Sequence, residues 1–192
     1  MHEHWQEVLD FWFGAPDSPR YGQAHAEWFR KSDAFDAQIR TRFALTHEVA
    51  SRGELAHWRA QPLSALALVI VLDQFPRNMY RGNARAFASD ARALDVALHM
   101  VAQRYDRSLM PVQRHFVYLP FEHAEDIAMQ RESVRLYETL RDDPQSAEAI
   151  DYAYRHRDII ERFGRFPHRN AILGRPSTSE ELQFLQQPGS SF

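Results

Sequence analysis

Two tracts that lie far apart in the chain combine phenylalanine, proline, arginine and asparagine in nearly the same order. The first is "DQFPRNMYRG" at 73–82 and the second is "FGRFPHRNAILGR" at 163–175. Guanidinium groups bind planar carboxylates and phosphates through paired hydrogen bonds. If the fold brings the tracts together, they form one polar site for an anion. The expected ligand-binding residues are Arg77, Asn78, Arg81, Arg165, His168, Arg169 and Asn170.

An architectural interpretation of the same tracts stays open. Proline disfavours the right-handed helical conformation for the residue before it, so each preceding helix is expected to end at or before Phe75 and Phe166. Turning the chain does not require arginine, but the protein's own carboxylates could neutralise the cations. The candidate internal partners are Asp73, Glu122, Glu125 and Asp126.

Two histidines occupy positions where the helical pattern predicts apolar side chains. His123 lies in the apolar stripe of a predicted helix over 111–141, and His156 lies in that of a helix over 145–163. A histidine beside a carboxylate is a common general acid–base pair. The candidate catalytic residues are His156, His123, Glu122 and Asp126. A hard ion held by two carboxylates and one histidine is an alternative, but no H-E-x-x-H motif occurs, and neither a metal site nor a cofactor is predicted.

Composition limits the class of protein. The chain has 192 residues, 44% of them hydrophobic and 26% charged, and suits one soluble domain spanning 1–192. It has no cysteine, and its net charge of -3 gives no general attraction to nucleic acid or to an acidic membrane surface. The longest apolar run, "ALALVIVL" at 65–72, is too short to span a bilayer. These features predict a cytoplasmic protein and leave its oligomeric state open.

The apolar residues repeat with helical spacing along almost the whole chain, and no segment alternates as a strand would. Residues 63–75 are apolar on every side, which predicts a buried central helix. Pro120 is expected to kink or divide the helix over 111–141, and Ser177 to Glu180 has the spacing of a capping box. The other helices are predicted at about 3–13, 22–31, 33–52, 85–105 and 178–187, with a frayed tail from about 187. The fold class is therefore all-α, with about eight helices in antiparallel pairs.

Several long stretches resemble a bacterial family known as domain of unknown function 924 (DUF924). They are "LALVIVLDQFPRNMYRG", "LPFEHAEDIAMQ" and "HRDIIERFGRFPHRNAILGR", and the resemblance extends over nearly the whole chain. It implies an all-α superhelix similar to tetratricopeptide repeats (TPR-like), although the tetratricopeptide consensus cannot be read in this sequence. The resemblance implies no function and assigns no site residue.

Three functions agree with these patterns. The first is binding of an anionic small molecule or peptide by the arginine- and asparagine-rich tracts. The second is an enzyme that acts on a small anionic substrate through a histidine and a carboxylate. The third is a purely structural role for the arginine–carboxylate network, with a protein partner bound elsewhere.

Overall fold

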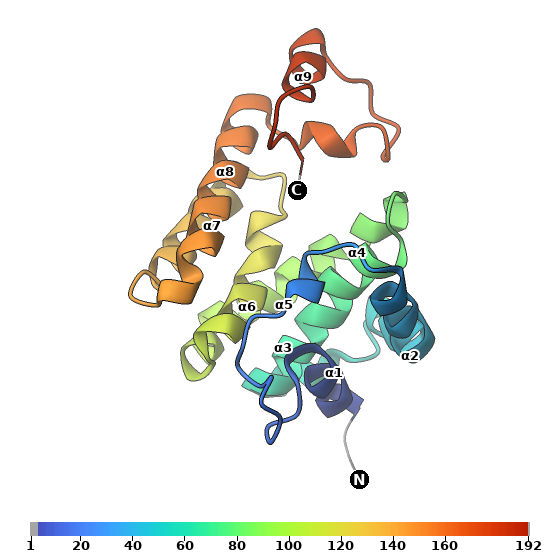
Figure 1. Cartoon of the computed structure of the whole chain (residues 1–192), viewed down its shortest axis with the longest axis vertical. Coiled ribbons are helices and arrows are strands. Elements are labelled where there is room, and N and C mark those ends of the chain that lie inside the picture. The colour runs from blue at the N-terminus through green and yellow to red at the C-terminus, as the bar shows by residue number, and fades with distance from the viewer. Residues whose placement is uncertain (1–3, 192) are drawn as a thin grey trace.

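The computed structural model describes residues 4–191, and helices joined by loops and 3-10 turns make up this part of the chain, without a strand (Figure 1). The all-α class is confirmed. Residue 3, the predicted start of the first helix, and residue 192 of the tail lie outside the described range. The α-helices are α1 (His4–Phe13), α2 (Asp33–Ser51), α3 (Pro62–Val69), α4 (Phe75–Met79), α5 (Asp90–Ala102), α6 (Pro111–Glu122), α7 (Ile127–Glu138), α8 (Ala147–Phe163) and α9 (Ser179–Phe184).

Most of the N-terminal aromatic residues pack into the interior around α3, which is buried from Ser64 to Val69 as its all-round apolar pattern predicts, whereas Phe29 and Leu63 are exposed. Trp12 is fully buried and stacks on Trp28, with ring centroids 5.9 Å apart. Its other neighbours include Phe75 at 5.7 Å and Phe116 at 5.5 Å. This core fixes α1 and α2 against the central helix and so sets the position of the first tract.

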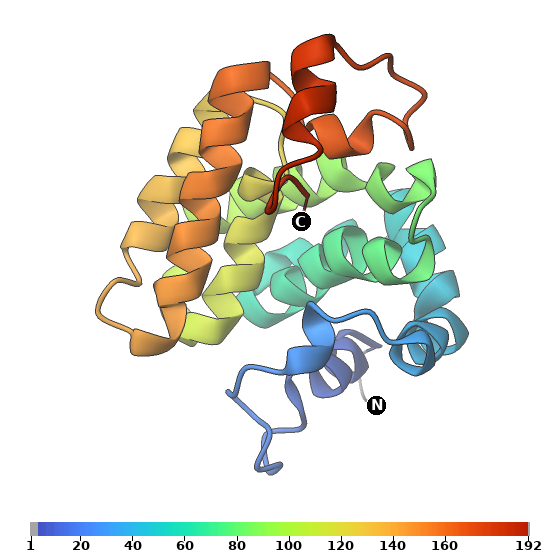
Figure 2. The same ribbon diagram turned by 45° about the horizontal axis from the view of Figure 1, so that its top comes forward.

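Helix α7 packs antiparallel to α6, and α8 packs antiparallel to α7, as Figures 1 and 2 show. The predicted helix over 111–141 is divided as expected, but the break comes after Glu122 rather than at Pro120, which lies inside α6. The Asp126 carboxylate accepts the backbone N–H groups of Ala128 and Met129 and thereby begins α7. A superhelix of the tetratricopeptide type stays an expectation.

In the first tract the helix continues past Phe75 and ends at Met79, which corrects the prediction that it ends at or before Phe75. A π-helical turn, Ile70–Gln74, joins α3 to α4, and Phe75 is helical with φ -58° and ψ -42°. A proline inside a helix leaves the carbonyl four residues earlier without its N–H partner. Here that carbonyl belongs to Leu72, and the Ser89 hydroxyl donates to it at 2.6 Å. The wider π turn and this bond from another segment allow the helix to continue past Pro76.

In the second tract the helix ends before Phe166, as predicted. Gly164, with φ 69°, terminates α8, and Phe166 is extended with φ -89° and ψ 106°. The capping box lies one residue later than predicted, since the hydroxyl and carboxylate that exchange bonds belong to Thr178 and Glu181.

One other prediction is corrected near the N-terminus. The helix expected over 22–31 is only a 3-10 turn, Ala26–Trp28. In the tail, the Ser190 hydroxyl donates to the Leu185 carbonyl at 3.2 Å, and fraying from about residue 187 stays a prediction.

Candidate functional site

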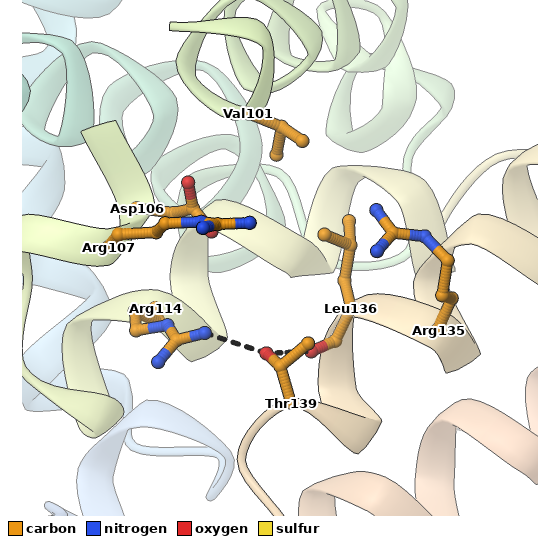
Figure 3. A pocket seen from close by; sticks show the side chains of 7 residues that line it. All are labelled: Val101, Asp106, Arg107, Arg114, Arg135, Leu136 and Thr139. Carbon is orange, nitrogen blue, oxygen red and sulfur yellow. Dashed lines mark hydrogen bonds between the residues drawn. The ribbon is translucent and has the colours of Figure 1, made fainter. Parts of the chain in front are cut away.

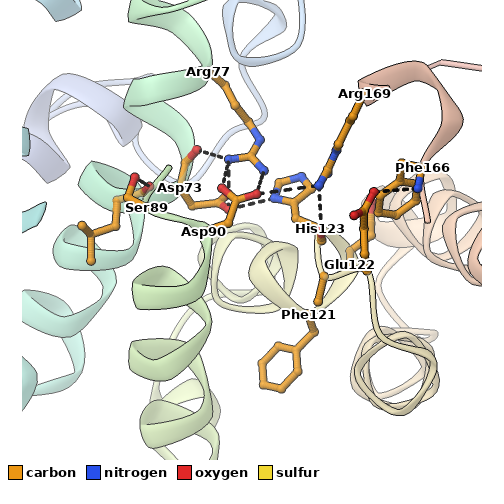
Figure 4. A network of polar contacts seen from close by, with 12 residues as sticks. Asp73, Arg77, Ser89, Asp90, Phe121, Glu122, His123, Phe166 and Arg169 are labelled. Atoms are coloured by element: carbon orange, nitrogen blue, oxygen red, sulfur yellow. Dashed lines mark hydrogen bonds and ion pairs between the residues drawn. The ribbon is translucent and has the colours of Figure 1, made fainter. Parts of the chain in front are cut away.

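The two arginine tracts meet at Asp90, the first residue of α5 (Figure 4). Arg77 binds the Asp90 carboxylate with both terminal nitrogens, at 2.9 and 3.0 Å. Arg169 Nη1 lies 3.8 Å from the same carboxylate. One cation from each tract therefore reaches a common carboxylate, and that carboxylate was not among the expected partners.

Asp73 is the fully buried anion of this cluster. Its carboxylate accepts hydrogen bonds from His123 Nδ1 at 2.8 Å and Gln74 Nε2 at 2.6 Å, and Arg77 Nη1 lies 3.3 Å away. Burial alone would raise the pKa of Asp73, but the charge of Arg77 and the bond from His123 outweigh it and hold the pKa well below its usual range. Asp73 is therefore ionised at neutral pH and can only accept hydrogen bonds.

His123 is thereby fixed in one tautomer. An ionised carboxylate requires a donor, so Nδ1 carries the proton and Nε2 of the neutral ring is an acceptor. Burial and the charge of Arg77 lower the pKa of His123, although Asp73 opposes them, so the ring is neutral at pH 7. Nε2 makes no hydrogen bond to any group in residues 4–191, and the side chain is 12% exposed. A buried aspartate thus orients an imidazole whose second nitrogen is available as a base.

Arg169 is held between two aromatic rings with part of its guanidinium unpaired. Its side chain is 7% exposed, and its central carbon lies 4.7 Å from the ring centroid of Phe87 and 4.5 Å from that of Phe166. Nη1 donates to the His123 carbonyl at 3.0 Å, whereas the buried Nε has no acceptor anywhere in residues 4–191. Burial and the charge of Arg77 lower the pKa of Arg169 to about 10, so it stays a cation at neutral pH.

Glu122 and His156 form a neutral pair beside this cluster. Glu122 Oε1 lies 3.2 Å from His156 Nδ1, which donates to the Tyr152 carbonyl at 2.8 Å. Burial and the negative charge of Asp73 raise the pKa of Glu122 to about 8, and burial lowers the pKa of His156 to about 3. At pH 7 the glutamate is therefore mostly a carboxylic acid and the contact is not an ion pair.

Other expected ligand-binding residues of the first tract bind the protein itself. Arg81 binds the buried Asp36 of α2 with Nε at 2.5 Å and Nη2 at 3.0 Å. Asn78 Nδ2 donates to the same carboxylate at 2.8 Å. We call Asp36, Asn78 and Arg81 the first outer pair group.

The second tract repeats this arrangement at Glu181 of α9. Arg165 binds the Glu181 carboxylate with Nε at 2.7 Å and Nη2 at 2.8 Å. Asn170 Nδ2 lies 3.3 Å from the same carboxylate and 3.0 Å from Ser177 Oγ. Glu181, Arg165 and Asn170 form the second outer pair group.

The remaining expected residues lie at the margin. Asp126 caps α7 and is not part of the cluster. The His168 ring lies 5.7 Å from the Phe166 ring, and burial together with the charge of Arg169 lowers the pKa of His168 to about 4. Among the expected internal partners, Glu125 binds Arg175 with both oxygens, at 2.6 and 2.9 Å.

Sequence reasoning missed Asp90 and the two rings that hold Arg169. Asp90 lies on the solvent-facing side of the predicted helix over 85–105, where an aspartate is ordinary, so no local signal marks it. No three histidine, aspartate or glutamate side chains in residues 4–191 are grouped so that they could hold a metal ion. In the same range, no helix is long and apolar enough to cross a bilayer.

Comparison with known proteins gives a family but no activity. A solved structure of a protein of unknown function, ATU0120 from Agrobacterium tumefaciens, is similar over 95% of this chain and 97% of that chain, with 41% identity and a TM-score of 0.85. No protein with a curated description matches the sequence. The model of a family described as "Bacterial protein of unknown function (DUF924)" matches residues 8–189. The chain belongs to the DUF924 family.

Proposed function

We propose that the protein binds a small anionic molecule, a carboxylate or a phosphate, at Arg169. The observation that carries this proposal is the buried Nε of Arg169, which has no acceptor in residues 4–191. Leaving a buried donor unpaired costs about 1–3 kcal/mol, and an anionic oxygen would recover that cost. The rings of Phe87 and Phe166 hold the guanidinium in place, so little conformational entropy is lost on binding.

Charge balance predicts that binding is coupled to a proton. The cations Arg77 and Arg169 already balance the anions Asp73 and Asp90, so a ligand adds uncompensated negative charge. His123 is the neighbouring group that can gain a positive charge. An anion raises the pKa of a nearby histidine, so the complex binds more protons than the free protein. The affinity is therefore expected to increase as the pH falls from 8 to 6.

A second candidate function, acid–base catalysis on the bound anion, is supported by the orientation of His123. Asp73 fixes the tautomer and would stabilise the imidazolium formed when Nε2 takes a proton from a substrate. Glu122 adds a carboxylic acid beside this pair, since its pKa is about 8. The substrate class would be a small carboxylate or phosphate that carries an acidic hydrogen.

Calorimetric titration with inorganic phosphate and a panel of two- to four-carbon carboxylates tests the binding. The change is Arg169→Gln, and the matched control is Arg81→Gln, which removes a cation from the first outer pair group. The wild type and the control are expected to bind the same anion, and Arg169→Gln to bind it about 10- to 100-fold more weakly. Equal affinities in the two variants would contradict the proposal, as would the absence of binding to folded wild type by any anion of the panel.

The catalytic candidate is tested with His123→Gln and the anion found in that titration. Exchange of the anion's carbon-bound hydrogen with deuterated water, followed by proton NMR, measures proton transfer directly. We expect exchange in the wild type and its loss in the variant, while the anion still binds. If the wild type catalyses no exchange in any anion that it binds, the protein is a binding protein only.

A further inference from the structure

A second cationic feature lies at the other end of α6, away from His123. A cavity of about 280 Å³ opens there between the end of α5, the start of α6 and α7. Three guanidinium groups reach it from different sides, with Arg107 and Arg114 across from Arg135 (Figure 3). The lining residues are Val101, Asp106, Arg107, Arg114, Arg135, Leu136 and Thr139.

Arg114 is fixed by its neighbours. Its Nε donates to the Tyr118 hydroxyl at 3.0 Å, and its Nη2 donates to Thr139 Oγ1 at 2.6 Å. The Tyr118 hydroxyl in turn donates to the buried Asp106 carboxylate at 2.8 Å. Both hydroxyl groups that accept from this guanidinium are uncharged. No carboxylate in residues 4–191 lies within ion-pair distance of Arg114. Its Nη1 has no acceptor there either.

The other two arginines differ in how far they are neutralised. Arg107 is exposed, and its side chain makes neither a hydrogen bond nor an ion pair with any group in the described part of the chain. Arg135 is paired with Glu132 through Nε at 2.7 Å and Nη2 at 2.5 Å. With Asp106 and Glu132 counted against the three cations, the cavity keeps an excess of positive charge.

We propose that this cavity is a second anion site, for the phosphoryl group of a small phosphate ester. A phosphate dianion presents oxygens in several directions, so it can accept from guanidiniums on opposite walls, whereas a carboxylate accepts within one plane. Val101 and Leu136 add apolar surface against which a small organic group can pack. Because Arg114 is already held in place, binding loses little side-chain entropy. The site is independent of the one at Arg169.

The test is an NMR titration of the full chain that follows the arginine Nε–H signals, with inorganic phosphate, glycerol 3-phosphate and acetate as probes. We expect the Arg114 signal to shift with both phosphates and much less with acetate. Arg107→Gln is expected to weaken phosphate binding about tenfold, because it removes a charge-assisted hydrogen bond. The Arg107 side chain has no partner within residues 4–191, so this variant should fold normally.

The matched control is Arg155→Gln, which removes an exposed arginine of α8 that pairs with Asp151 and does not line the cavity. This variant and Arg169→Gln should keep wild-type phosphate shifts at Arg114, which separates this site from the proposed function. The proposal fails if Arg107→Gln and Arg155→Gln bind phosphate equally, or if acetate shifts the Arg114 signal as much as phosphate does at the same concentration. It also fails if Arg169→Gln abolishes the shifts.

Discussion

The central cluster of Asp73, Arg77, Asp90, His123 and Arg169 differs from the two outer pair groups in how completely its hydrogen bonds are made. In the outer groups, one buried carboxylate receives both Nε and Nη2 of an arginine and an asparagine amide. In the central cluster, one arginine Nε and one imidazole Nε2 have no partner in residues 4–191.

Within the same two sequence tracts, this difference distinguishes groups whose hydrogen bonds are complete from groups that keep a free donor or acceptor. Buried polar groups in folded proteins are almost always paired, so each exception requires an explanation. The outer groups tie α2 and α9 to the turns and need no ligand. The unpaired donor and acceptor lie together in the central cluster, which is where a ligand would complete the bonding.

Removing the buried Asp73 carboxylate should give the largest loss of stability. Asp73→Ala leaves Arg77 without one of its two anions and His123 without its acceptor in a fully buried position. We expect the free energy of unfolding to fall by about 3–5 kcal/mol, measured by urea denaturation.

The matched variant is Asp36→Ala in the first outer pair group. It should cost less, because the freed Arg81 side chain is 36% exposed and can be hydrated. A larger loss for Asp36→Ala than for Asp73→Ala would mean that the outer group, not the centre, holds the two tracts in place.

The free energy of unfolding should fall both at low pH and at high pH, and different residues should cause the two losses. His156 and His168 have pKa values of about 3 and 4 when folded and about 6.5 when unfolded, so stability falls as the pH drops below about 6.5. Glu122 has the opposite effect on the pH dependence of stability. Its pKa is about 8 when folded and about 4.3 when unfolded, so its contribution is lost as the pH rises from about 4.3 through 8.

Glu122→Gln should therefore remove the loss of stability at high pH. Relative to wild type, we expect it to gain about 1–3 kcal/mol in the free energy of unfolding between pH 5 and pH 8, measured by urea denaturation at each pH. Glu125→Gln is the control, because Glu125 is paired with Arg175 and causes no such loss. Parallel pH profiles for wild type and Glu122→Gln would show that Glu122 is already ionised.

The smallest expected effect belongs to the N-cap of α9, beside the second outer pair group. Thr178→Ala removes the hydroxyl that caps α9 and accepts the Glu181 N–H at 3.2 Å. The expected loss is about 1 kcal/mol, measured by urea denaturation, with anion affinity at Arg169 unchanged. A weaker affinity would show that α9 is coupled to the central cluster.

Local patterns predicted much of this molecule correctly. Helical spacing identified most of the helices, the buried helix over 63–75 and the inward positions of His123 and His156, because periodicity depends only on which side of a helix faces the core. The central helix was predicted to end at or before Phe75 because a local steric rule could not include the hydroxyl of Ser89. Asp90 was missed because an aspartate at an exposed helical position has no distinctive pattern.

The sequence by itself determined the all-α class, the two arginine tracts and the titratable residues that lie near them, since these follow from residue types and their spacing. Only the tertiary structure decided which cations are neutralised and which keep a free donor. Arg81 and Arg165 bind buried carboxylates of α2 and α9, whereas Arg169 packs against two aromatic rings and its Nε has no acceptor in residues 4–191. Whether an arginine is neutralised depends on how helices that are distant in sequence pack together, and a local sequence pattern does not determine the contacts between them.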